Sequence, residues 1–302
     1  MDVILNFIIY MKVEIFFDSK RTKTATYVLT DLKNKKCAII DSVLDYDPAN
    51  GSTYTENADK VIKFIQINNL QLEWILETHV HADHLTASQY IKSKLGGETA
   101  IGANIKKVLA FWKPIFDDNN IKEDGSQFDM LWQDGDEFRI GNIGAKVIYT
   151  PGHTPSCVSY LIEDYLFTGD TIFSPLVGTA RTDFPGGSSE ELFDSIQKIY
   201  QLPDDIKVCV GHEYPNKDFE PVIITTIGEE KRNNISINQT TKKEEYVAKM
   251  NAKQVNNAVP QLILPSVHIN LLGGRLPKFI KIPVNVIGAA KNYSADGGGC
   301  AG

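Results

Sequence analysis

Three of the chain's six histidines lie within six residues, in the segment "ETHVHADHLTAS" from Glu77 to Ser88. His79, His81 and His84 share this segment with one carboxylate, Asp83. Imidazole and carboxylate groups together are typical ligands of zinc, iron or manganese rather than of calcium or magnesium. The segment therefore indicates a transition-metal site, provided that other parts of the chain supply further ligands.

Three more candidate ligands each follow an expected strand. His153 follows "AKVIYT", Asp170 follows "YLFTG", and His212 follows "IKVCVG". Strand ends at one edge of a sheet converge, and α/β proteins build ligand sites there. Buried polar groups cost a few kcal/mol unless they are paired, so a chance collection of this many is disfavoured. We predict one shared site for these residues and the histidine segment.

The ligand types fit two arrangements. In the first, seven side chains hold two ions: His79, His81 and His153 take one, Asp83, His84 and His212 take the other, and Asp170 bridges them. In the second, two histidines and one carboxylate hold a single iron and leave coordination positions open. The ligand set alone is compatible with both.

Strands and helices interleave to position these ligands. Strands are expected at "TYVLTDL", "KKCAIIDSV" and "LEWILET", and later at "DEFRIG", "AKVIYT", "CVSYLIE", "YLFTGD" and "IKVCVG". Apolar spacing predicts helices over 57–69, 86–97, 104–116 and 188–203. From Phe219 to about Val259 the chain reads as polar and helical, and residues 260–286 read as β-rich. This order predicts an α/β sandwich with sheets inside and helices outside, in one domain with a C-terminal extension.

Composition excludes several classes of protein. The net charge of −7 argues against a nucleic-acid partner. Four cysteines without a C-x-x-C pair predict a reduced, cytoplasmic protein, in which Cys37 and Cys209 are small buried residues. No segment reaches transmembrane length, and either Met1 or Met11 could be the translation start. His268 stands apart from the other histidines and is expected to be an ordinary core or surface residue.

The pattern T-H-x-H-x-D-H, followed by G-H-T, G-D and G-H, resembles the metallo-β-lactamase superfamily over Thr78 to His212. The resemblance implies an αββα sandwich with the metal site at the edge between two sheets. The loops "THVHADH", "GTARTDFPGG" and "GHEYP" are similar to those of persulfide dioxygenases. Stretches such as "IIDSVLDYDPANGST" and "PSVHINLLGGRLP" resemble bacterial β-lactamase hydrolase-like sulfur dioxygenases, from about Glu14 to Val286. A metal-binding domain over 14–220 and a helical and β extension over 221–302 are expected.

The persulfide dioxygenase resemblance implies specific roles. One Fe(II) per chain would be held by His79, His153 and Asp170, while His81, Asp83, His84 and His212 would orient the ligands and a water. Asp83 and Tyr214 are assigned to catalysis, with Tyr214 offering a phenol donor to substrate or being an ordinary packed tyrosine. Arg181 would clamp a substrate carboxylate, or form a structural ion pair with Asp183.

Three functions compete. The first is an iron-dependent dioxygenase that converts glutathione persulfide and O2 into sulfite and glutathione. The second is a hydrolase with up to two Zn(II), such as a glyoxalase II-like thioesterase, in which a metal-bound water attacks a carbonyl. The third is an inactive scaffold, against which the intact ligand set argues. Glyoxalase II carries a helical C-terminal domain, so the β-rich reading of 260–286 favours the dioxygenase. We also expect a small-molecule thiol substrate, glutathione persulfide, and no nucleic-acid or membrane partner. A homodimer is compatible with the sequence.

Overall fold

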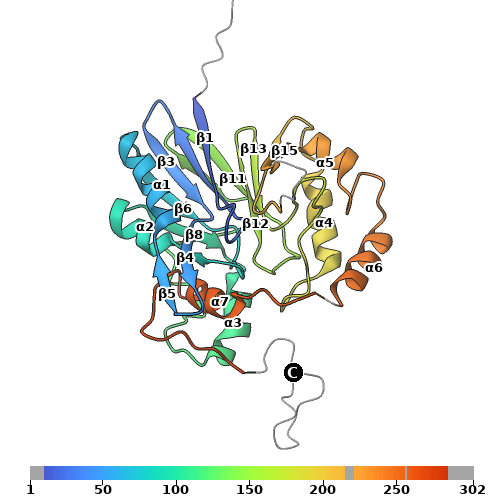
Figure 1. The fold of residues 1–302 in the computed structure, drawn as a ribbon. Helices are drawn as coiled ribbons and strands as arrows, with labels where there is room; N and C mark the ends of the chain where they lie inside the picture. Colours follow the sequence, from blue (N-terminus) through green and yellow to red (C-terminus); the bar gives the residue numbers. More distant parts are fainter. Residues whose placement is uncertain (1–9, 215–220, 256, 285–302) are drawn as a thin grey trace, which may run out of the picture.

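Two six-stranded sheets face each other, and helices cover their outer faces (Figure 1). The computed structural model describes residues 10–214, 221–255 and 257–284. This arrangement confirms the predicted αββα sandwich. The question of Met1 or Met11 as the start depends on residues 1–9, which lie outside the described ranges, as does Cys300.

The first sheet has the strand order β1-β2-β3-β6-β8-β9. Its strands are β1 (Met11–Phe17), β2 (Ala25–Asp31), β3 (Lys36–Ile40), β6 (Gln71–Leu76), β8 (Glu98–Gly102) and β9 (Met130–Trp132). The strands β1, β2 and β3 pair antiparallel, whereas β3, β6, β8 and β9 pair parallel. Parallel pairing brings the carboxyl ends of β3 and β6 to one edge, and the histidine segment begins there.

The second sheet has the order β10-β11-β12-β13-β14-β15. Its strands are β10 (Glu137–Ile140), β11 (Ile143–Tyr149), β12 (Val158–Ile162), β13 (Tyr165–Gly169), β14 (Lys207–Val210) and β15 (Ile224–Thr226). The parallel pair β13 and β14 places Asp170 and His212 at neighbouring strand ends. A small third sheet joins β5 (Ser52–Tyr54), β4 (Val43–Asp47) and β7 (Leu85–Thr86).

Alternation along the strands divides the apolar residues between two layers. On β2, Tyr27 and Leu29 point into the core between the sheets, while Val28 packs in a separate cluster with the outer helices. The Tyr27 hydroxyl donates to the Val210 carbonyl across this core at 2.6 Å. Burial of apolar surface on both faces of each sheet holds the sandwich together.

The helices predicted from apolar spacing are present. The first sheet is covered by α1 (Glu56–Ile67), α2 (Ser88–Leu95) and α3 (Ile105–Phe116). The second is covered by α4 (Ser189–Ile199), α5 (Ile227–Asn233) and α6 (Lys243–Gln254). The Ser188 hydroxyl caps α4 by accepting from the Glu191 amide at 3.2 Å. No helix in the described ranges is long and apolar enough to cross a membrane.

The β-rich prediction for 260–286 is wrong. Ile263–Leu271 form a helix, α7, and residues 272–284 contain no strand. Every residue from Pro265 to Leu271 is buried, because α7 packs between the outer helices and the histidine segment. Residues 267–271 alternate apolar and polar side chains, which is the period of a strand, and the polar residues of α7 are buried as well, so no exposed polar face marks the helix in the sequence. Pro265 lies in the first turn, where its missing amide costs no hydrogen bond. The tail is therefore helical, and it no longer argues against the hydrolase.

Candidate metal centre

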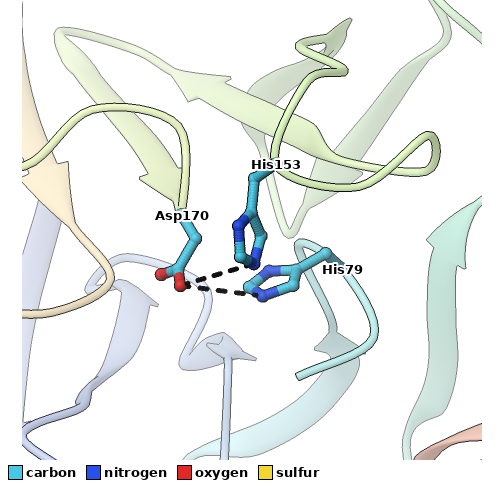
Figure 2. A group of neighbouring side chains, drawn as sticks. All are labelled: His79, His153 and Asp170. Atoms are coloured by element: carbon cyan, nitrogen blue, oxygen red, sulfur yellow. Dashed lines mark ion pairs between the residues drawn. The ribbon is translucent and has the colours of Figure 1, made fainter. Parts of the chain in front are cut away.

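His79, His153 and Asp170 converge at the edge between the two sheets (Figure 2). His79 follows β6 of the first sheet, whereas His153 and Asp170 follow β11 and β13 of the second. The Asp170 Oδ2 atom lies 3.7 Å from His153 Nε2 and 4.0 Å from His79 Nε2. All three side chains are buried. These separations suit three ligands that surround one ion.

Hydrogen bonds fix which nitrogen of each ring faces the centre. His153 Nδ1 donates to the Arg181 carbonyl at 2.7 Å. His79 Nδ1 lies 3.0 Å from the Thr78 hydroxyl, which itself donates to Asp41 and therefore accepts from His79. Both rings thus turn an Nε2 lone pair toward Asp170.

Two buried atoms of this trio have no hydrogen-bond partner among the described residues: His79 Nε2 and Asp170 Oδ1. Leaving a buried acceptor unpaired costs about 1–3 kcal/mol, and more for a charged group. Asp170 Oδ1 has His212 Nε2 at 3.5 Å, whereas Asp170 Oδ2 faces His79 and His153. A divalent cation would pair with His79 Nε2 and the Asp170 carboxylate. The residues present therefore fit a transition-metal ion.

Burial keeps the rings of the trio in the neutral form that binds metal. Burial, together with the neighbouring His81 and His153, holds the pKa of His79 well below its usual value. Burial also lowers the pKa of His153, although the Asp170 carboxylate partly opposes this. No proton has to leave either ring before a metal ion binds.

Asp83, His84 and His212 form a second group beside the trio. Asp83 Oδ2 lies 3.0 Å from His84 Nδ1 and 3.5 Å from His212 Nε2, and it accepts from the Thr24 hydroxyl at 3.2 Å. Although burial opposes it, the charges of His212 and His84 hold the pKa of Asp83 well below its usual range. Burial by itself would lower the pKa of His212. The Asp170 and Asp83 carboxylates outweigh burial and raise this pKa to about 9.

His81 is held by two buried carboxylates. Its Nε2 atom lies 3.0 Å from Asp41 Oδ1 and 3.4 Å from Glu77 Oε2. Burial by itself would lower the pKa of His81. The two carboxylates, mainly Asp41, outweigh burial and raise this pKa well above its usual value. His81 Nδ1 and His84 Nε2 have no partner among the described residues. His84 Nε2 gives the second group some capacity for an ion of its own, whereas the raised pKa of His81 keeps a proton on that ring.

Three residues that support the centre were missed by the sequence prediction. Asp41 accepts from the backbone amide and the hydroxyl of Thr78, each at 2.8 Å, and Glu77 lies beside His81. Both directly follow a buried strand, which is the signal that identified His153 and Asp170. The third is Asn270 on α7. Its Nδ2 donates to the carbonyls of His81 and His84 at 2.9 Å, and its Oδ1 accepts from the Thr86 amide at 2.8 Å.

Arg181 and Tyr214 line a cavity of about 480 Å³ that His153 and Asp170 of the trio also line. Arg181 forms an ion pair with Asp183, with Nε at 2.5 Å and Nη2 at 2.6 Å from its two oxygens, and Nη1 donates to the Ala258 carbonyl at 2.7 Å. The structural ion pair is thus the arrangement that is present. Tyr214 is half exposed and stacks on His212 at a centroid distance of 5.9 Å.

The histidine and cysteines outside the centre behave as expected. His268 is buried, with Nε2 3.0 Å from Asp118 Oδ2, and it stacks on Phe116. It is a core residue whose hydrogen bonds are made within the protein, and Asp118 is a charged partner that the sequence did not indicate. Cys37 and Cys209 are buried and free, which confirms their prediction as small core residues.

The family model described as "Metallo-beta-lactamase superfamily" matches residues 21–212, nearly two thirds of the chain. The matched range includes every residue of the trio and of the second group. The chain belongs to the metallo-beta-lactamase superfamily. Members of this superfamily are metal-dependent enzymes, and the His and Asp groups described above are in keeping with that. The predicted family is thereby confirmed.

Individual relatives carry different names. A Dictyostelium discoideum protein named Glyoxylase B2 is 44% identical, covering 91% of this chain and 98% of its own length. A Xylella fastidiosa "Beta-lactamase hydrolase-like protein" is 42% identical over 91% of this chain, which spans only 65% of that protein. The human protein named "Persulfide dioxygenase ETHE1, mitochondrial" is 30% identical, covering 78% of this chain and 82% of its own length.

One crystal structure shows the same likeness in three dimensions. ETHE1 from Myxococcus xanthus superposes with a TM-score of 0.70 at 30% identity, covering 87% of this chain and all of the ETHE1 chain. The resemblance to both the hydrolase-like and the persulfide dioxygenase branches is confirmed. The names do not agree on one reaction, so the reaction has to be argued from the site.

Proposed function

We propose that this superfamily member is an iron(II)-dependent persulfide dioxygenase. It would convert glutathione persulfide, O2 and water into sulfite and glutathione. The observation that carries the proposal is the trio: two neutral imidazoles with fixed Nε2 lone pairs and one carboxylate, around a point where the buried His79 Nε2 has no hydrogen-bond partner among the described residues. Two histidines and one carboxylate with open positions are typical of non-haem iron oxygenases.

The second group supports a single ion at neutral pH. Asp83 is already engaged by His84, His212 and Thr24, and the raised pKa of His212 keeps a proton on its ring. The relative named persulfide dioxygenase ETHE1 and the similar ETHE1 structure support the choice of reaction. When bound, iron(II) supplies the redox chemistry by which O2 oxidises the outer sulfur of the persulfide.

The chain's own residues would prepare the substrate. Phe173 and Phe184 line the cavity and would present apolar surface to the reacting sulfur. His212 holds a proton at Nε2, 3.5 Å from both Asp83 and Asp170, where it can donate to a developing anion. Tyr214, stacked on His212 at the cavity, offers a second hydrogen-bond donor.

A binuclear zinc hydrolase is the second candidate. Its support is His84 Nε2, a buried ring nitrogen without a partner among the described residues, together with the helical tail and the relative named Glyoxylase B2. In that enzyme the second group would hold an ion of its own.

Metal content after anaerobic reconstitution separates the two candidates. We expect about one iron per chain in the wild type. His153→Ala and Asp170→Ala should each lose most of it, because each removes one of three protein ligands. Asp83→Ala is the matched control, since it removes a carboxylate from the second group and should keep the iron. Two zinc ions per chain, with no iron uptake and with loss of one zinc in Asp83→Ala, would support the hydrolase instead.

A further inference from the structure

The cavity that reaches His153 and Asp170 is lined by residues from two parts of the chain. One part comes from residues inside the range that the superfamily model matches. The other part lies beyond that range: Tyr214, Met250, Lys253, Gln254, Asn257 and Pro260. Helix α6 supplies three of these residues, so a segment outside the matched range forms one side of the substrate cavity.

Four lysine and arginine side chains line this cavity, and three of them are already engaged. Arg181 is paired with both oxygens of Asp183. Arg21 Nη1 lies 3.2 Å from Asp45 Oδ1, and the Lys23 ammonium donates to the Ser19 carbonyl. Lys253 makes no ion pair or hydrogen bond with any residue in the described part of the chain. The carboxylates that line the cavity, Asp83 and Asp170, both belong to the metal centre.

Helix α6 is fixed against the loop that carries Arg181. The Tyr246 hydroxyl lies 2.9 Å from the Thr179 hydroxyl, and Gln254 Oε1 accepts from the amide and hydroxyl of Thr182. Tyr246 and Met250 are buried in the core between α6 and the second sheet. The backbone of Lys253 therefore has a defined position, and only its flexible side chain has to move toward a ligand.

We propose that Lys253 is a specificity-determining residue that binds a carboxylate of the substrate, at the end remote from the reacting sulfur. The inference rests on the proposed function for the identity of the sulfur compound. It selects a class of substrate: the persulfide of a small acidic thiol, such as a peptide thiol with free carboxylates. A neutral thiol would gain nothing from the ammonium. Lys253, rather than Arg181, would therefore bind the substrate carboxylate, because the Arg181 guanidinium is already bonded to both oxygens of Asp183.

Binding and turnover test this inference separately. The first probe is S-methylglutathione, whose equilibrium binding is measured by calorimetry without turnover, with its diethyl ester as the uncharged comparison. Lys253→Gln should raise the Kd of S-methylglutathione about three- to tenfold, as expected for an exposed charge pair that becomes partly desolvated. The Kd of the diethyl ester should not change, and Lys253→Arg should restore most of the binding. Lys249→Gln is the control, since Lys249 lies on the same helix but does not line the cavity.

In turnover with glutathione persulfide, Lys253→Gln should raise KM by a similar factor and leave kcat within about twofold, because the contact is shared by ground and transition states. An unchanged Kd in Lys253→Gln, or an equal loss in Lys249→Gln, would overturn the inference. If the wild type consumes no oxygen while Lys253→Gln still weakens binding of S-methylglutathione, the proposed function fails and the carboxylate site stands.

Discussion

At the scale of single residues, the histidines of the centre differ in the charge that their surroundings favour. Burial lowers the pKa of His79 and His153, so these rings are neutral. Carboxylates outweigh burial at His81 and His212, so these rings hold protons. Similar residue types in one small volume are thereby prepared for different tasks. The neutral pair can accept a metal ion at once, whereas a protonated ring must first release its proton.

This difference predicts separate pH dependences for the two metal positions. A metal ion at the second group must displace a proton from His212, whose pKa is about 9. Zinc affinity at that position should therefore rise about tenfold per pH unit from pH 7 and level off near pH 9. Affinity at the His79, His153 and Asp170 position should stay nearly constant over this range. Chelator-buffered zinc titrations at pH 7, 8 and 9 would measure both. Equal slopes at the two positions would contradict this division of the histidines.

The sequence indicated most residues of the centre because they follow strands. His153, Asp170 and His212 were found in this way, and the same signal pointed to Asp41 and Glu77, which were overlooked. The sequence left two roles open for Arg181, a substrate clamp or an ion pair with Asp183, and could not choose between them because the choice depends on side-chain packing. Asp183 lies two residues away and offers both oxygens to the guanidinium at 2.5 and 2.6 Å.

At the scale of elements, the prediction succeeded where one face of the element is exposed. Helices α1 and α4 show a clear apolar period because only one side of each is buried. Helix α7 was misread because it is buried on all sides, and the run from Val267 to Leu271 alternates apolar and polar residues as a strand would. The error concealed a functional contact, since α7 presents Asn270 to the backbone of the histidine segment.

Asn270→Ala should loosen that segment. It would leave the carbonyls of His81 and His84 and the amide of Thr86 without their buried partner. We expect the free energy of unfolding to fall by about 2–3 kcal/mol. Metal affinity should weaken about 10- to 100-fold, as for other residues that orient ligands. Urea unfolding and metal competition titrations would measure the two effects.

Asn233→Ala is a suitable control for this prediction. Asn233 ends α5, is exposed, and contacts Glu229 on the same helix at 2.7 Å. It should change the free energy of unfolding by less than about 0.5 kcal/mol. Full metal affinity in Asn270→Ala would show that the histidine segment keeps its geometry without α7.

At the scale of the whole molecule, the metal centre lies at the junction of two halves. The first sheet leads to His79, and the second leads to His153, Asp170 and His212. The core between the sheets holds these strand ends in register across the junction. The alternation of strands and helices in the sequence was sufficient to predict this sandwich. The fold does not choose between dioxygenase and hydrolase, however, because one fold supports several chemistries through its sites.

Oxygen uptake is the most direct test of the central claim. Iron(II)-loaded wild-type protein is mixed with glutathione persulfide, and O2 consumption and sulfite are measured together. The proposed reaction predicts one sulfite formed per O2 consumed, with the activity lost in Asp170→Ala. Zinc-loaded protein should show no oxygen uptake and no rapid hydrolysis of a glutathione thioester. Absence of oxygen uptake by the iron-loaded protein, with rapid thioester hydrolysis by the zinc-loaded protein, would contradict the dioxygenase and establish the hydrolase.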